Sequence, residues 1–333
     1  MSTSKFVISL DFELFWGVSD RRTVAAYGPN VLGEWEAVPA MLAMFRRYGV
    51  RVTWATVGMI MCRDYQHWRE IRPPAPPAYL QSRLSPYELD ALVKEHGPLF
   101  FARSLVDRIL ATPGQELATH TYSHFYCGEP GATPEQFAAD LACAGHIAAE
   151  MGVRFRSAVL PRNQIVPAFL DVLPAAGIGV YRGNGRHWLY RNGDAVAGGV
   201  AGRAMRFADA FLPLSGNGTV REEQHGCLVN LPASLFLYPW DRSGSLLPAL
   251  RLRRVKAAMT AAAVSGGVFH LWWHPHNFGI NLAQNLGLLD EVLRHYRVLA
   301  DRYGMESHSM GDFDAALGET AEPVMDSMKW GQP

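Results

Sequence analysis

Short apolar segments that end in charged or polar side chains are the feature that most limits the folds open to this chain. The first segment, 6–10, is rich in branched residues and leads directly into Asp11 and Glu13. Apolar residues at helical spacing follow over 35–48, and 50–57 again has the composition of a strand. Such a strand–helix–strand start is typical of a parallel sheet with crossover helices.

The same alternation continues through most of the chain. Further strands are predicted over 115–119, 156–160, 179–181, 228–231 and 267–273. Further helices are predicted over 102–110, 134–151, 167–176, 246–264 and 284–303, with Thr133 as the N-cap of the second. About seven strand–helix units result, and in a (β/α) barrel the carboxyl ends of the strands carry the active site.

Two stretches interrupt this pattern. The segment 63–98 contains the Pro-rich run 72–77 and is interpreted as an insertion that flanks the site, with a functionless surface excursion as the alternative. The segment 183–225 shows no clear period and is expected to form loops and irregular hairpins. We therefore expect one barrel domain over 1–318 and a frayed polar tail over 319–333.

The charge balance and the cysteines restrict the class of partner. Lys plus Arg and Asp plus Glu are equal at 31 each, which argues against nucleic acid or an anionic membrane surface as the main partner. The 4 cysteines form no CxxC pair, and reduced thiols are expected. No secretory signal and no membrane-spanning run are visible, so a soluble cytoplasmic protein is expected; the oligomeric state is left open.

Carboxylates and histidines of metal-binding type occur in two of the strand-end motifs. Asp11 and Glu13 are two apart on a strand, so that their side chains share one face. One of them is suited to bind a metal ion while the other accepts a proton from the attacking water. His120 and His124 would join the same ion if the chain turns into a helix after Thr119. The alternatives are a pair of surface acids and a pair of histidines in the core or on the surface.

The strand predicted over 267–273 ends in further chemistry-bearing residues. His270, Trp272 and His274 alternate on one face, and Pro275 ends the strand directly after His274. A histidine at this tip is suited to protonate a leaving amine as general acid. His270, four residues before His274 on the same strand, is an orienting or structural group, or a substrate contact. Trp272 either stacks on a sugar ring or belongs to the core.

Three polar residues follow the strand predicted over 156–160. Arg162 is expected to hold and orient the catalytic carboxylate, because a guanidinium binds a carboxylate through two parallel hydrogen bonds. Asn163 and Gln164 are candidates to bind substrate hydroxyl groups. A weaker polar cluster after the next strand comprises Arg182, Asn184, Arg186 and Trp188.

Taken in order, these motifs resemble those of the polysaccharide deacetylases, the NodB-like group of carbohydrate esterase family 4. The run from His120 to His124 resembles the family's HxxxH metal motif, and Trp272-Trp273-His274 resembles its Leu-x-His motif. The likeness covers 5–277. Two departures stand out: Asp11 and Glu13 are separated by Phe12, which resembles a DxE branch, and Arg162 is followed by Asn163 and Gln164 in place of two prolines.

The resemblance implies a distorted or incomplete (β/α) barrel that holds a divalent metal ion, most often Zn²⁺. By resemblance Asp11 is the base, Glu13, His120 and His124 are the metal ligands, and His274 is the acid. The implied substrate is an acetylated amino sugar that is free, nucleotide-linked or lipid-linked, in surface-polysaccharide or sugar-nucleotide metabolism. The alternatives are an amidase acting on a small molecule and a catalytically inactive glycan-binding barrel.

Overall fold

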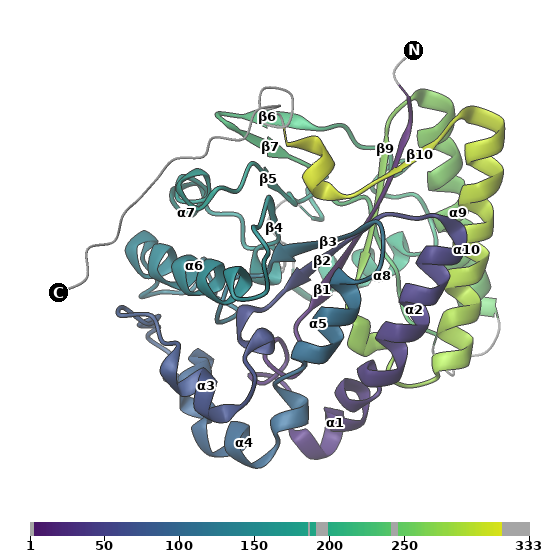
Figure 1. Ribbon diagram of the computed structural model, residues 1–333. Coiled ribbons are helices and arrows are strands. Elements are labelled where there is room, and N and C mark those ends of the chain that lie inside the picture. Colours follow the sequence, from purple (N-terminus) through teal and green to yellow (C-terminus); the bar gives the residue numbers. More distant parts are fainter. Residues whose placement is uncertain (1–2, 186, 191–198, 241–245, 315–333) are drawn as a thin grey trace.

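A curled and mostly parallel sheet forms the centre of the computed structural model, which describes residues 3–185, 187–190, 199–240 and 246–314 (Figure 1). Arg186 and the tail expected over 319–333 lie outside these residues. The strands are β1 Lys5–Phe12, β2 Val52–Thr56, β3 Gln115–Thr119, β4 Ser157–Ala158, β5 Val180–Tyr181, β6 Glu223–His225, β7 Leu228–Asn230, β8 Leu235–Phe236, β9 Val268–Trp273 and β10 Glu306–His308.

The strands follow one another in the order β6-β7-β5-β4-β3-β2-β1-β9-β8, and β10 pairs with the first half of β1. Every pair of neighbouring strands is parallel except β6 and β7. Among the described residues β6 and β8, the two ends of this path, do not pair with each other. The sheet is therefore an open barrel of 10 strands. The expected count of seven was too low because β6, β8 and β10 are only two or three residues long.

Helices cover the outside of the sheet. The α-helices are α1 Val24–Leu32, α2 Glu34–Tyr48, α3 Tyr65–Glu70, α4 Asp90–Glu95, α5 Arg103–Leu110, α6 Pro134–Ala149, α7 Pro167–Leu170, α8 Gly199–Asp209, α9 Leu246–Ser265 and α10 Leu282–Tyr303. The short 3₁₀ helices are η1 Gly58–Met61, η2 Ser82–Leu84, η3 Pro86–Leu89, η4 Gly97–Leu99, η5 Pro161–Asn163, η6 Pro174–Ala176, η7 Pro275–Phe278 and η8 Met310–Phe313. In Figure 1, α2, α9 and α10 stand on one side of the sheet and α6 and α7 on the other.

The two faces of β1 have different neighbours, as expected from the alternation of side chains along a strand. Phe6, Ile8, Leu10 and Phe12 join the large apolar core that includes the helices. Val7 belongs to a small cluster inside the barrel, with one residue from each of several other strands. The next residues on this inner face are polar, so the barrel interior changes from apolar to polar towards the carboxyl ends of the strands.

A half-buried carboxylate links neighbouring strands at their amino ends. Glu116 on β3 accepts hydrogen bonds from the hydroxyl groups of Thr53 on β2 (2.6 Å) and Ser157 on β4 (2.6 Å). It also accepts one from the backbone N–H of Gly311 in η8 (2.9 Å). One side chain therefore links three neighbouring strands and η8 at the end opposite to the polar motifs.

Several local predictions are confirmed and others are wrong. Thr133 caps α6 in a capping box, as expected, and all seven predicted strands are present. Four α-helices were missed, of which the short α3 and α4 lie in the segment 63–98 that was interpreted as an insertion. In α1 the signal is broken by Gly28 and Pro29, and in α8 it is diluted by glycine and arginine within the stretch expected to be loops.

The segment 63–98, which contains the Pro-rich run 72–77, packs against the loop that follows β3 and carries His120 and His124. It forms short helices, and its Ile71 carbonyl accepts a hydrogen bond from the hydroxyl of Tyr122 (2.6 Å). Its Tyr79 hydroxyl accepts another from the backbone N–H of Tyr126 (2.7 Å). The segment supports the loop that follows β3.

The cysteines Cys62, Cys127, Cys143 and Cys227 are all free thiols, as expected. Among the described helices, none has both the length and the apolar character needed to cross a bilayer.

Replacing Glu116 with alanine is predicted to lower the free energy of unfolding by about 2–4 kcal/mol, because the buried Thr53 and Ser157 hydroxyls lose their acceptor. Urea denaturation measures the change. Glu95→Ala, at a side chain 73% exposed, is the matched control and should change stability by less than about 0.5 kcal/mol. Equal losses in the two variants would contradict the role given to Glu116.

Candidate metal centre and active site

Three buried side chains from distant parts of the chain converge at the carboxyl ends of β1 and β3. One ligand atom from each of Glu13, His120 and His124 lies within 4.8 Å of the other two. The Nε2 atoms of His124 and His120 are 3.2 Å and 3.5 Å from the same carboxylate oxygen, Oε2 of Glu13. The structure thus gathers the carboxylate and both imidazoles that the sequence singled out.

The hydrogen bond on the far side of the His120 ring fixes its tautomer. Nδ1 of His120 lies 2.8 Å from the carbonyl oxygen of Val159, which accepts hydrogen bonds but donates none. Nδ1 therefore carries a proton, and Nε2 is the ring nitrogen that faces Glu13. The Nδ1 atom of His124 contacts the Tyr126 hydroxyl at 3.1 Å. Such outer contacts hold imidazoles in the orientation that metal binding requires.

The segment between the two histidines is a strained loop and not the expected helix. Thr121 and His124 both have left-handed backbone conformations, with φ of 64° and 56°. The carboxylate of Asp140 on α6 accepts hydrogen bonds from the backbone N–H groups of Tyr122 (2.7 Å) and Ser123 (3.1 Å). These bonds replace those a helix would have made. Non-glycine residues in this conformation cost energy and occur often at functional sites.

Asp11 is held by Arg182. Nη1 and Nη2 of Arg182, at the end of β5, donate to the two carboxylate oxygens of Asp11 at 2.6 Å and 2.8 Å. Both side chains are almost fully buried. Burial acts to raise the pKa of Asp11, but the charge of Arg182 outweighs it and the pKa is lowered. Asp11 is therefore ionised at neutral pH.

The orienting role expected of Arg162 was wrong. Arg162 forms an ion pair with Asp20 and another with Glu129, and its guanidinium lies 4.0 Å from the centre of the Tyr126 ring. Its backbone is left-handed, with φ of 55°, and its carboxylate partners are Asp20 and Glu129 instead of Asp11. Arg162 thus packs against the ring of Tyr126, whose hydroxyl contacts His124.

His274 stands between the two carboxylates. Its Nε2 atom is 3.7 Å from Oδ2 of Asp11 and 3.7 Å from Oε1 of Glu13, and its side chain is 25% exposed. The His274 ring stacks on that of His276 with centroids 4.9 Å apart and an interplanar angle of 10°. His276 is buried, and its Nδ1 atom lies 3.8 Å from Oε1 of Glu13.

The candidate substrate contacts fall into two groups. Asn163 and Trp272 line the cavity in front of the carboxylates. His270 is fully buried beneath it and contacts the Ser9 hydroxyl at 2.8 Å, so it is a structural group and its assignment as a substrate contact was wrong. Gln164 is not among the lining residues, and its side-chain oxygen accepts the Gly128 N–H at 2.9 Å.

Sequence reasoning missed several residues of the site. His276 carried a usable signal, since it follows His274 at a spacing of two just past the end of a strand. Arg182 was noted as part of a polar cluster, but nothing in the sequence indicated Asp11 as its partner. Asp20 and Asp140 had no signal, because their roles depend on contacts made by the folded chain.

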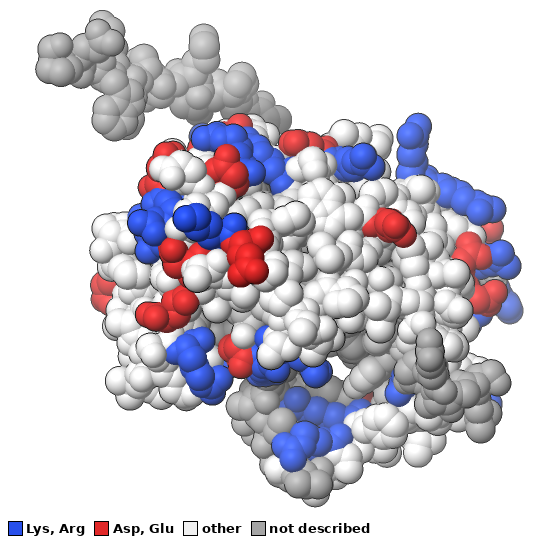
Figure 2. Space-filling view, turned by 90° about the horizontal axis from the view of Figure 1, so that it is seen from below, with Lys and Arg blue, Asp and Glu red and all other residues white. Residues whose placement is uncertain are grey.

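The cavity at this site has a volume of about 200 Å³. Viewed from the side where β1 ends, the surface is hollowed, and the hollow contains basic side chains (Figure 2). The cavity is lined by Asp11, Glu13, Gly17, Val18, Arg21, Arg22, Tyr27, His120, His124, Arg162, Asn163, Trp272, His274 and His276.

The protonation states suit a bound cation. Burial acts to raise the pKa of Glu13, yet the neighbouring histidines His274, His120 and His124 hold it well below its usual range. Burial lowers the pKa of His124, and it lowers that of His276 to about 3 with help from the charge of His274. An ionised carboxylate and a neutral imidazole are the forms that bind metal. Glu13, His120 and His124 thus fit a divalent ion such as Zn²⁺, with further positions left for water and substrate.

Comparisons with known proteins identify the fold. No protein-family model matches the sequence, and no curated protein matches it significantly. A solved structure named as a polysaccharide deacetylase from Mycobacterium smegmatis is similar over 98% of this chain and 96% of its own, with a TM-score of 0.60 and 16% identity. One so named from Pseudomonas aeruginosa is similar over 94% and 89%, with a TM-score of 0.53 and 12% identity.

The same fold also occurs in enzymes of another class. The α-amylase AmyC from Thermotoga maritima is similar over 96% of this chain and 75% of its own, with a TM-score of 0.55 and 10% identity. At such low identities the likeness concerns the fold alone, and the chemistry must be argued from the side chains. The chain has the open α/β barrel found in proteins named as polysaccharide deacetylases.

Replacing Arg182 with methionine is predicted to lower the free energy of unfolding by about 3–5 kcal/mol, because it leaves the charge of Asp11 buried without a partner. The double variant Asp11→Asn/Arg182→Met should recover much of this loss. Urea denaturation of both single variants and the double variant gives the coupling energy. A double variant no more stable than Arg182→Met would rule out the pairing.

Proposed function

We propose that this protein is a metal-dependent hydrolase that removes an N-acetyl group from an amino sugar, and that it is a distant relative of the polysaccharide deacetylases of carbohydrate esterase family 4. The observation that carries the proposal is the buried cluster of Glu13, His120 and His124 beside Asp11 and His274. Two imidazoles and one carboxylate with open positions are typical of catalytic metal sites.

Glu13, His120 and His124 are the proposed ligands of a divalent ion, most often Zn²⁺ in sites of this composition. When bound, such an ion polarises the amide carbonyl, lowers the pKa of water and stabilises negative charge on oxygen. Glu13 suits this role better than Asp11, because both oxygens of Asp11 already accept hydrogen bonds from Arg182.

The other residues supply the proton transfers. Asp11, kept ionised by Arg182, accepts a proton from the water molecule whose oxygen attacks the carbonyl carbon. His274 donates a proton to the nitrogen as the C–N bond breaks, and acetate and a free amine leave. His274 is more exposed than the other histidines of the site, as a group that meets substrate must be. His276 supports its ring by stacking.

A sugar is the proposed substrate because hydrogen-bond donors line the cavity in front of the proposed metal ligands. Arg21, Arg22, Arg162 and Asn163 provide donors for hydroxyl groups, and Tyr27 provides a partly polar ring. The proteins of similar fold include ones named as polysaccharide deacetylases. Other assignments remain as alternatives: an amidase on a small molecule would release ammonia instead of acetate, and an inactive glycan-binding barrel would release neither.

Glycosidic-bond chemistry, as in the α-amylase of similar fold, is the less suitable assignment. It needs one carboxyl group that is protonated and one that is ionised. Here both Asp11 and Glu13 have lowered pKa values, since Arg182 and the histidines outweigh the effect of burial. A pair of ionised carboxylates beside two imidazoles is better suited to a cation.

His120→Ala is predicted to abolish both the bound metal and the release of acetate from N-acetylglucosamine oligomers, because one of three ligands is lost. Elemental analysis of the purified protein gives the metal content. His146→Ala, at a side chain 66% exposed on α6, is the control and should retain both. Full acetate release by His120→Ala would remove the proposal.

Asp11→Asn is predicted to keep the metal but lower kcat by about 10²–10⁴-fold, since the base is lost while the ligands remain. The same acetate assay and metal analysis apply. Loss of metal together with activity would indicate instead that Asp11 is a ligand.

A further inference from the structure

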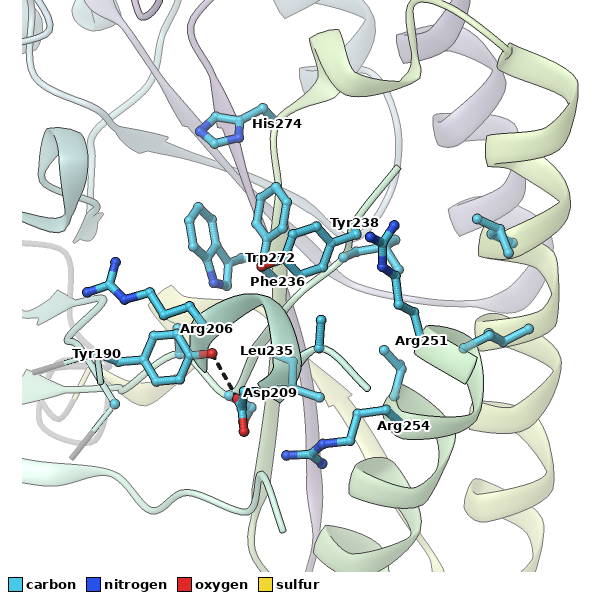
Figure 3. Close-up of a pocket in the computed structure, with 18 of the residues that line it drawn as sticks. Tyr190, Arg206, Asp209, Leu235, Phe236, Tyr238, Arg251, Arg254, Trp272 and His274 are labelled. Carbon is cyan, nitrogen blue, oxygen red and sulfur yellow. Dashed lines mark hydrogen bonds between the residues drawn. The ribbon is translucent and has the colours of Figure 1, made fainter. Parts of the chain in front are cut away.

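A second cavity lies against the site. It has a volume of about 300 Å³, and three residues, Asn163, Trp272 and His274, line both this cavity and the one in front of the carboxylates. Figure 3 shows His274 at one end of the second cavity, with Trp272 and Phe236 next to it and Asp209 and Arg254 further away. The two cavities therefore meet at the proposed catalytic acid.

The walls of the second cavity are mainly apolar. They come from β8, the chain after it, α9 and α10, with further residues from α8 and from the chain after β5, and their apolar members include Leu235, Phe236, Leu237, Leu252, Val255 and Leu288. The cavity in front of the carboxylates, in contrast, is lined by Arg21, Arg22, Arg162 and Tyr27. The site thus consists of a polar and an apolar compartment on either side of His274.

The polar groups in the apolar compartment largely serve the protein itself. The carboxylate of Asp209 accepts hydrogen bonds from the Tyr190 hydroxyl (2.8 Å) and from the backbone N–H (2.6 Å) and hydroxyl (2.7 Å) of Ser215. Arg254 donates to the Gly216 carbonyl at 2.7 Å. Arg206 donates through Nε to the Leu189 carbonyl at 2.6 Å, and Asn184 donates to the Asn163 carbonyl at 3.0 Å. The Arg251 guanidinium lies over the rings of Phe207, Phe211 and Tyr238. Most polar groups of these walls thus already contact the protein, which leaves fewer of them for a sugar ring.

An amide has two sides, and the two compartments match them. If hydrolysis occurs at the carboxylates and His274, the polar sugar on the nitrogen side occupies the polar compartment. The acyl side then points to the compartment beyond Trp272, which is far larger than one methyl group needs. We propose that the second cavity, here named the acyl cavity, binds an N-acyl chain longer than acetyl. This inference rests on the proposed hydrolase function.

The chemistry is unchanged by the longer chain. Water adds its oxygen to the carbonyl carbon, the C–N bond breaks, the nitrogen takes a proton from His274, and a carboxylic acid leaves with the amino sugar. Burial of the extra methylenes in the acyl cavity favours the longer substrate, by about three- to fourfold in kcat/KM for each methylene.

The test compares N-acetyl-, N-butyryl- and N-hexanoylglucosamine as substrates of the metal-loaded protein, with the released acid measured. We expect kcat/KM to rise about tenfold from acetyl to butyryl and further to hexanoyl. Leu252→Trp, which fills the cavity from α9, should remove most of this gain. Val264→Trp, at an exposed position of the same helix, is the control and should keep the wild-type ratio.

A binding measurement makes the test independent of turnover. Hexanoate, the product, should raise the Tm of the wild-type protein more than acetate does, and Leu252→Trp should lose this difference while Val264→Trp keeps it. Equal effects of the two acids on the wild type would overturn the proposal.

The outcomes separate this inference from the function on which it rests. Cleavage of the acetyl substrate with no gain for longer chains overturns the acyl cavity and leaves the hydrolase proposal standing. Cleavage of none of the amides overturns the hydrolase proposal. A gain with the hexyl glycoside of N-acetylglucosamine and none with N-hexanoylglucosamine assigns the cavity to the glycosidic substituent and also overturns the inference.

Discussion

Two carboxylates buried inside the barrel, Asp11 and Glu13, are the constraint on which the rest of the site depends. A carboxylate removed from water is costly unless charge or hydrogen bonds compensate it. The chain compensates each one differently: Arg182 holds Asp11 in a bidentate pair, while imidazoles surround Glu13. The charge of Asp11 is already balanced by Arg182. Glu13 and its imidazoles are a set of ligands that a divalent cation could join, and for this reason the cluster is a candidate catalytic centre.

The supporting structure acts on the ligands through the backbone. Asp140 holds the N–H groups between the two histidines, and the Pro-rich segment packs beneath the same loop through Ile71 and Tyr79. These contacts offset the energetic cost of the loop's left-handed residues. The shape of the loop therefore depends on contacts with other parts of the chain. At the other end of the barrel, Glu116 links the strands from which the loops start. Rigid strands and externally held loops are suited to position a site accurately.

The sequence predicted which residues meet at the site better than it predicted the contacts that these residues make. Strand alternation and polar residues at strand ends were sufficient to group Asp11, Glu13, His120, His124 and His274, because parallel strands bring their carboxyl ends to one edge. The partner of Asp11 was misassigned, since two arginines, Arg162 and Arg182, follow neighbouring strands and the sequence does not show which of them reaches Asp11. The loop form of the HxxxH segment depends on Asp140, which is distant in sequence. Strands of two or three residues carry too few side chains to show a period.

If the proposed function holds, the division of the site into a polar and an apolar compartment would allow the substrate preference to change while Glu13, His120 and His124 stay the same. The most direct test of the whole account is X-ray absorption spectroscopy of the protein loaded with one equivalent of Zn²⁺. The account predicts a metal environment with two imidazole nitrogens and carboxylate oxygen, which changes when His124 is replaced by alanine. An environment without imidazole, or one unaffected by that replacement, would contradict it.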